Sequence, residues 1–250
     1  MVLESILIVL CINLAGLFFC YTQQSDKATD LIYSISFFAL TLTLWLSNHS
    51  SYAHNLLLIA VTLWSIRLGS YLFIRIHTMG KDDRFDKMRK NLFKISRFWF
   101  LQTGSILILS IPIIITFQKP SIEYHFIQIL GFGIYLIGLI IESIADYQKF
   151  NFRKNTDNNN SFVNVGLWKH IQHPNYLGEI LCWTGIFIIA SSALIGWEWL
   201  ALSSPVWITV LLIFISGIPF LRRSSIKKYG HLKEYHEYIE QTPYLFPGIF

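Results

Sequence analysis

The sequence has few charged residues and few cysteines. Only 14% of its 250 residues are Asp, Glu, Lys or Arg, against about a quarter in a typical soluble domain, which excludes an ordinary soluble globule. Cys11, Cys20 and Cys182 lie in apolar stretches without a CxxC pair, so neither a disulfide framework nor a zinc site is expected. The first apolar block contains Glu4 and has no basic segment before it and no small-residue cleavage site after it. We interpret it as a retained helix rather than a signal peptide.

Apolar residues are abundant and come in long blocks. They make up 53% of the chain, and several blocks reach the roughly 20 residues that cross a bilayer as a helix. The sequence therefore predicts an all-α integral membrane protein, a bundle of about seven transmembrane helices. The predicted spans are residues 3–20, 31–47, 53–75, 99–117, 126–147, 176–195 and 200–221. The sequence has no internal repeat, so we expect residues 1–250 to form a single polytopic membrane domain.

Lysine and arginine are distributed very unevenly between the loops. With seven spans, the segments 21–30, 75–98, 148–175 and 222–250 fall on one side of the membrane and hold 18 of the 20 basic residues. The positive-inside rule places that side in the cytoplasm, with the N-terminus outside and the C-terminus cytoplasmic. The net charge of +5 thus reflects membrane topology, and nucleic acid is not expected as a partner.

A charged stripe follows the fifth predicted span. Glu142, Asp146, Lys149 and Arg153 share one helix face by their spacing. A carboxylate inside a span costs about 2.5–3.5 kcal/mol, so such residues usually face a bundle interior or a polar cavity. The bases suit phosphate, and the acids suit a carboxamide or ribose hydroxyls. The alternative is a ladder of salt bridges along the helix.

Residues 166–179 read GLWKHIQHPNYLGE and are the most informative stretch. Pro174 predicts the start of the sixth span, whose free N–H groups and positive dipole end suit an anion. His170 and His173 have no third ligand in a metal-binding pattern, so no metal site is expected. Interfacial histidines, and aromatic-belt roles for Trp168 and Tyr176, are the simpler alternatives.

The basic tail after the last span has an ordinary explanation and a functional one. Stop-transfer charges or contact with anionic lipid is the default interpretation. Arg223 and Lys227, four residues apart, also suit phosphate, and Tyr235 and Tyr238 suit a planar ring. From the basic segment 75–98 we single out only Arg84, which follows two aspartates.

These motifs together resemble a known family. Residues 166–179 are similar to the signature of the DUF1295 proteins, within the steroid 5-alpha-reductase superfamily. The similarity covers about residues 60–250, with the cofactor-binding part at about 142–250. The further matching motifs are Arg67-Leu68 with Tyr71-Leu72 and Arg75, Gly80 to Arg84, Asp146 to Lys149 with Phe152-Arg153, Ser216 to Pro219, and Tyr229-Gly230 with Tyr235, Tyr238, Thr242 and Pro247.

The resemblance implies a membrane reductase that uses NADPH on an activated carbon–carbon double bond of a steroid-like or other lipidic substrate. It implies a cofactor pocket that faces the cytoplasm between the last helices. The cofactor-binding residues implied by motif position are Arg84, Asp146, Lys149, Arg153, Trp168, His173, Asn175, Tyr176, Arg223 and Tyr235. Two departures from the family pattern are Gln172, where an arginine is usual, and Arg222, where an acid is frequent.

Catalytic and substrate-binding residues follow less directly. Glu179 lies within a span just past the predicted cofactor contacts and is our catalytic candidate, as the group that polarises the substrate carbonyl. Asp30 and Tyr33 are predicted to line the substrate site from their position at the start of the second span. Trp64 stands where steroid 5-alpha-reductases have a tyrosine near the substrate carbonyl. We expect a lipophilic substrate that enters from the bilayer.

Two other functions remain open. Isoprenylcysteine carboxyl methyltransferases, which use S-adenosylmethionine, share a similar segment but usually carry two glutamates where this chain has Arg222 and Arg223. A non-catalytic sterol- or lipid-binding membrane protein with the same fold is the third reading. Frequent Ile, Asn and Lys favour a bacterial inner membrane as the location, or the endoplasmic reticulum if the source is eukaryotic.

Overall fold

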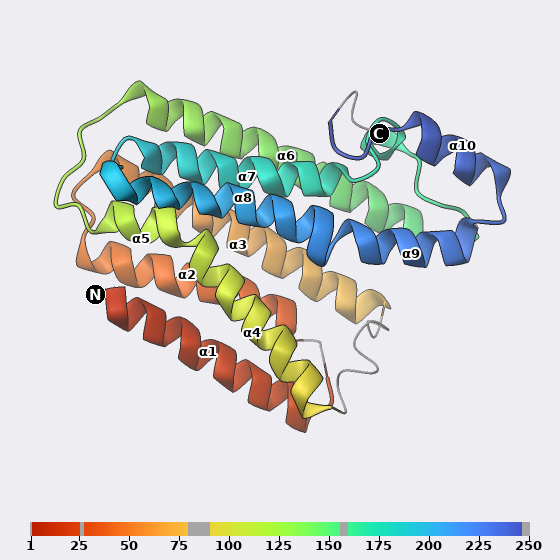
Figure 1. The fold of residues 1–250 in the computed structure, drawn as a ribbon, viewed down its shortest axis with the longest axis horizontal. Coiled ribbons are helices and arrows are strands. Elements are labelled where there is room, and N and C mark those ends of the chain that lie inside the picture. The colour runs from red at the N-terminus through yellow and green to blue at the C-terminus, as the bar shows by residue number, and fades with distance from the viewer. Residues whose placement is uncertain (1, 26–27, 80–90, 156–159, 247–250) are drawn as a thin grey trace. The chain divides into compact units, whose positions relative to one another are not determined.

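A computed structural model describes residues 2–25, 28–79, 91–155 and 160–246. Over these residues the chain is helical and contains no strand (Figure 1), which confirms the predicted all-α class. The elements are α1 (Val2–Thr22), α2 (Thr29–Ser47), α3 (Tyr52–Met79), α4 (Leu92–Leu109), α5 (Ile111–Phe117), α6 (Phe126–Lys154), η3 (Gly166–Lys169), α7 (Pro174–Ser191), η4 (Gly196–Leu202), α8 (Ser203–Val210), η5 (Leu211–Ile215), α9 (Ile218–Tyr229) and α10 (Lys233–Gln241).

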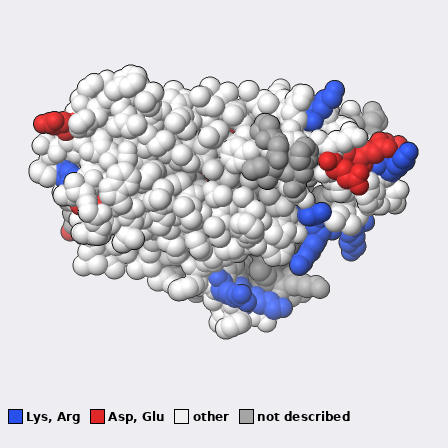
Figure 2. All heavy atoms as spheres, turned by 45° about the horizontal axis from the view of Figure 1, so that its top comes forward, with Lys and Arg blue, Asp and Glu red and all other residues white. Residues whose placement is uncertain are grey.

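Five helical segments of the described chain are long and apolar enough to cross a membrane. They are α1, α2, α4, α6 and the stretch Gly196–Tyr229. On the face shown in Figure 2, charged side chains are few and a broad surface carries none. An uncharged surface suits helices that contact lipid tails, and the chain is an integral membrane protein.

Two predicted spans are interrupted in the structure. The span predicted at 99–117 consists of α4 and α5, with Ser110 between them and Pro112 at the start of α5. Proline lacks an N–H and cannot continue the hydrogen-bond ladder of the preceding turn. The last predicted span contains the π-helical turn η5, and α9 begins after Gly217. A β-carbon at Gly217 would collide with the carbonyl oxygen of Leu212, so the bend requires glycine there.

The chain divides into two compact units. Unit 1 comprises Met1–Phe132 and Gly185–Ser204, and unit 2 comprises Gly133–Thr184 and Pro205–Phe250. In unit 1, α2 packs on α1 and α3, and α4 packs on α1. The buried Asn13 of α1 donates to Ser36 Oγ of α2 at 3.0 Å and accepts from Gln102 of α4 at 3.3 Å. Hydrogen bonds between helices in an apolar bundle stabilise by about 0.6 kcal/mol on average, so this network ties three helices together.

Unit 2 is organised around the crossing of α6 and α7, which lie side by side (Figure 1). A β-carbon on Gly138 of α6 would lie 2.6 Å from the carbonyl oxygen of Gly178 of α7. The two backbones therefore approach as closely as glycine allows. Beyond this crossing, the indole of Trp168 in η3 donates to the carbonyl oxygen of Ala145 at 2.9 Å, which fixes η3 against α6.

The close crossing predicts a stability difference between two glycines of the same helix. Gly138→Ala should lower the melting temperature, because its methyl group meets backbone atoms that cannot move independently of α7. A loss of about 1–3 kcal/mol is expected from overpacking. Gly133→Ala is the matched control, since nothing lies within 4 Å of its β-carbon. Thermal unfolding in detergent measures both, and equal melting temperatures for the two variants would contradict the close crossing.

Candidate functional site

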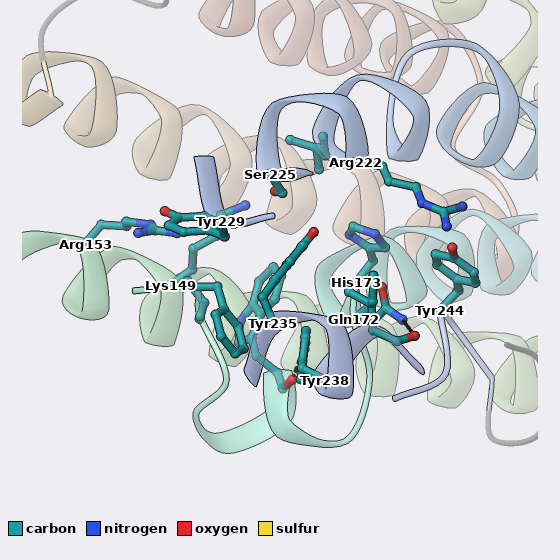
Figure 3. Close-up of a pocket in the computed structure, with 15 residues that line it drawn as sticks. Lys149, Arg153, Gln172, His173, Arg222, Ser225, Tyr229, Tyr235, Tyr238 and Tyr244 are labelled. Atoms are coloured by element: carbon teal, nitrogen blue, oxygen red, sulfur yellow. Dashed lines mark hydrogen bonds between the residues drawn. The ribbon is translucent and has the colours of Figure 1, made fainter. Parts of the chain in front are cut away.

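Unit 2 contains a cavity lined by the C-terminal part of α6, by α9 and α10, and by the turn that precedes α7 (Figure 3). Its walls combine cations with aromatic rings. The cations are Lys149, Arg153 and Arg222, and the rings are Phe162, Trp168, Tyr229, Tyr235, Tyr238 and Tyr244, together with the imidazole of His173. Among the described residues no aspartate or glutamate lines it. The cavity is therefore electropositive and suits an anionic ligand with planar groups.

Each cation is held against an aromatic ring. Lys149 Nζ lies 4.9 Å from the ring centre of Trp168, and the guanidinium carbon of Arg153 lies 5.6 Å from that of Tyr229. Arg153 also donates to the carbonyl oxygen of Ser161 at 2.9 Å. Such contacts orient a flexible cation before a ligand arrives. Two cations one turn apart on α6 are thus prepared for the oxygens of a phosphate group.

Three tyrosines of the cavity, Tyr229, Tyr235 and Tyr238, form one packed group around Phe162. The ring of Phe162 lies 5.3 Å from that of Tyr235 and 5.0 Å from that of Tyr238. Tyr238 donates its hydroxyl to the carbonyl oxygen of Trp168 at 2.6 Å. Burial raises the pKa of Tyr238 and of Tyr235, so both hydroxyls stay protonated donors at neutral pH.

His173 is a neutral imidazole at the edge of the cavity. Its ring stacks on Tyr176 at 5.3 Å and parallel to Tyr244 at 6.4 Å. Burial, and then the nearby charge of Lys149, lower the pKa of His173 to about 3. Its Nδ1 atom is buried and has no hydrogen-bond partner among the described residues. A buried polar atom without a protein partner is a natural contact for a bound ligand.

The structure brings half of the predicted cofactor contacts together. Those that line the cavity are Lys149, Arg153, Trp168, His173 and Tyr235. Tyr176 supports the imidazole of His173 from α7, and Asn175 beside it has a buried Oδ1 without a partner in the described chain. Asp146 is buried on α6, one turn before Lys149. Asp146, Asn175 and Tyr176 are not among the residues that line the cavity.

Two predicted arginine contacts are not observed in this group. Arg84 lies outside the described residues. Arg223 is exposed, and its neighbour Arg222 lines the cavity with its guanidinium carbon 5.7 Å from the ring centre of Tyr244. The spacing of Arg222, Ser225 and Tyr229 on α9 is the signal for this face, because residues three and four apart share one side of a helix. The sequence analysis instead predicted Arg223, on the adjacent face of α9, as the phosphate contact.

Glu179 lies on α7 of the same unit and is 9% exposed. Its Oε1 accepts a hydrogen bond from the indole of Trp183 at 2.9 Å, and it does not line the cavity. The indole therefore fixes the carboxyl group in one orientation, one turn from the residues that begin α7.

The three predicted substrate-binding residues belong to unit 1. Tyr33 of α2 packs edge-on against Trp64 of α3, with ring centres 6.0 Å apart, and both contact Phe37. Trp64 is fully buried, whereas Asp30 is partly exposed at the start of α2. The structure thus brings Tyr33 and Trp64 together in one aromatic cluster.

The chain matches a known family over most of its length. The family described as "Protein of unknown function (DUF1295)" matches residues 18–242. The chain belongs to this DUF1295 family. The match confirms the family resemblance of the sequence motifs.

This DUF1295 protein is also a distant homologue of steroid dehydrogenases. It is 27% identical over 122 residues to 3-oxo-5-alpha-steroid 4-dehydrogenase 1 of Macaca fascicularis, covering 49% of this chain and 41% of the relative. For the Homo sapiens enzyme the identity is 26% and the shares are 49% and 42%. An uncharacterized Schizosaccharomyces pombe protein is 37% identical over 90 residues, 36% of this chain and 30% of its own length. The matches thus span less than half the length of these relatives. No solved structure matches the chain.

Proposed function

We propose that this DUF1295 protein is an integral-membrane reductase that uses NADPH to reduce a carbon–carbon double bond conjugated to a carbonyl group in a lipidic, steroid-like substrate. The observation that carries the proposal is the cavity of unit 2, where three cations and a wall of aromatic rings meet without a described carboxylate. NADPH combines phosphate groups with planar rings, so its chemistry fits these residues. When bound, NADPH supplies the hydride for the electron-poor carbon of the double bond.

The proposal gives each group of residues a task. Lys149, Arg153 and Arg222 neutralise phosphate oxygens. Trp168 and Tyr235 offer ring faces, and burial raises the pKa of Tyr235. The buried His173 Nδ1 and Asn175 Oδ1 have no hydrogen-bond partner among the described residues. Both atoms make polar contacts to the bound cofactor.

Further residues complete the proposed cofactor site. Asp146 accepts a hydrogen bond from a carboxamide or ribose hydroxyl, and Tyr176 keeps the imidazole of His173 in place. Arg84 and Arg223 stay as additional phosphate contacts predicted from the sequence motifs. We also propose that the cations Lys149, Arg153 and Arg222 make the protein bind NADPH in preference to NADH.

The carbonyl of the substrate needs a hydrogen-bond donor. We assign this task to Glu179, whose Oε1 is occupied by the Trp183 indole. In its protonated form this carboxyl group would donate the hydrogen bond to the carbonyl oxygen. Asp30, Tyr33 and Trp64 of unit 1 stay the proposed substrate-binding residues.

The proposed membrane topology has seven spans in one polytopic domain. Five of these spans are the apolar segments described above, and α3 and α7 correspond to the other two predicted spans. The distribution of lysine and arginine supports an N-terminus outside and a C-terminus in the cytoplasm, where NADPH is available. The substrate then enters from the bilayer, with the bacterial inner membrane as the proposed location.

Thermal unfolding of the detergent-purified protein with NADPH, NADH or S-adenosylmethionine tests the cofactor. A ligand that binds only the folded protein stabilises it by about 2.7 kcal/mol at a hundredfold excess over its Kd. A rise in melting temperature with NADPH, larger than with NADH, is expected. A rise with S-adenosylmethionine alone would instead assign methyl transfer, and no rise with any of the three would favour a non-catalytic lipid-binding protein.

A further inference from the structure

The chain after α9 returns to the turn that precedes α7 and is fastened there by hydrogen bonds. The side-chain amide of Gln172 donates to the carbonyl oxygens of Ile239, at 3.1 Å, and Thr242. The backbone N–H of Gln172 donates to the carbonyl oxygen of Pro243 at 2.9 Å. The N–H of His173 donates to that of Tyr244 at 3.2 Å. Four hydrogen bonds from two consecutive residues thus hold one short segment.

The fastened segment supplies one wall of the cavity. Ile239 and Tyr244 of this segment line it, next to Tyr235 and Tyr238 from the preceding part of α10. Figure 3 shows the three tyrosines. α10 has only 9 residues, and isolated helices of this length are marginal in water. Its position therefore depends on contacts with the rest of unit 2. The buried carboxamide of Gln172 provides one contact to Ile239 in α10 and one to Thr242 directly after it.

We propose that Gln172 is a positioning residue that latches residues 239–244 onto the turn before α7. This latch keeps Tyr235, Tyr238 and Tyr244 in place before a ligand enters. The proposal rests on the proposed function only for the identity of the ligand. Its chemical requirement is specific, because the buried carbonyl oxygen of Thr242 and the partly buried one of Ile239 need N–H donors. Leaving buried acceptors unsatisfied is unfavourable, and here the acceptors belong to the segment that must stay docked.

Donor capacity separates the variants that keep the latch from those that lose it. The methionine of Gln172→Met has a similar length but no hydrogen-bond donor. Residues 239–244 should therefore detach more often from the turn before α7. Gln172→Arg carries five N–H donors and no acceptor, so it should supply both carbonyl oxygens. Gln241→Met makes the same change at an exposed position of α10 and is the matched control.

Hydrogen–deuterium exchange of the full-length protein in lipid nanodiscs, without ligand, measures docking directly. For Gln172→Met we expect amides of residues 233–246 to exchange at least tenfold faster than in the wild type. Amides of α7 should exchange at the wild-type rate. Gln172→Arg and Gln241→Met should stay within about threefold of the wild type. Equal exchange in Gln172→Met and the wild type would overturn the latch.

NADPH titration of the same proteins adds the functional consequence. Gln172→Met should raise the Kd for NADPH about tenfold, and the KM for NADPH in parallel, while kcat at saturating NADPH stays within twofold. A fall in kcat with an unchanged Kd would overturn the positioning role. If Gln172→Met does not fold, Gln172→Arg decides, since accelerated exchange in that variant contradicts the donor requirement. A wild type that shows a protected segment but no NADPH binding would reject the proposed cofactor and leave the latch intact.

Discussion

Replacing Arg153 with alanine should raise the Kd for NADPH by about 10- to 100-fold. A hydrogen bond to a charged group contributes about 1.5–3 kcal/mol, and each 1.4 kcal/mol is tenfold in affinity. Arg153 is held in advance by the carbonyl oxygen of Ser161 and the ring of Tyr229. Little side-chain entropy is therefore lost when its guanidinium binds phosphate oxygens, so most of the interaction should appear in the Kd.

Lys154→Ala is the matched control for this experiment. Lys154 follows Arg153 on α6 with the same charge, but it is exposed and does not line the cavity. Its removal should change the Kd by less than about twofold. Fluorescence titration with NADPH at two salt concentrations measures both variants, and the salt dependence should weaken for Arg153→Ala only. The same Kd for Arg153→Ala and the wild type would remove Arg153 from the site.

Replacing Glu179 with glutamine should lower kcat about 100-fold or more while the Kd for NADPH stays unchanged. General acid–base groups contribute about 10²–10⁴ in rate, and glutamine cannot give up a proton as a carboxylic acid does. Its side-chain oxygen still accepts the hydrogen bond from Trp183 that the structure gives to Glu179. The substitution therefore removes the proton chemistry and preserves the packing of α7.

NADPH oxidation in the presence of a conjugated 3-oxo steroid measures this effect. Trp183→Phe is the comparison variant, because it removes the indole donor and keeps the carboxyl group. It should lower kcat by no more than about tenfold, through looser orientation of Glu179. A wild-type kcat for Glu179→Gln would show that another group polarises the carbonyl.

The helices could be predicted because their causes are local. Apolar blocks of about 20 residues and the proline at 174 act through short segments of chain, and α7 begins at Pro174 as predicted. The face shared by Lys149 and Arg153 also follows from helix geometry alone, and both residues line the cavity. The breaks at Pro112 and Gly217 were missed, because hydropathy does not detect a change in helix direction.

The sequence by itself determined the all-α membrane class, the start of α7 and the cationic end of α6, since desolvation and backbone hydrogen bonding act along the chain. Only the tertiary structure decided that Arg222 rather than Arg223 faces the cavity, and that Gln172 fastens the C-terminal segment. Tyr244 reaches His173 across about seventy residues of sequence. Such contacts depend on packing and on hydrogen bonds between distant segments, which no local periodicity records.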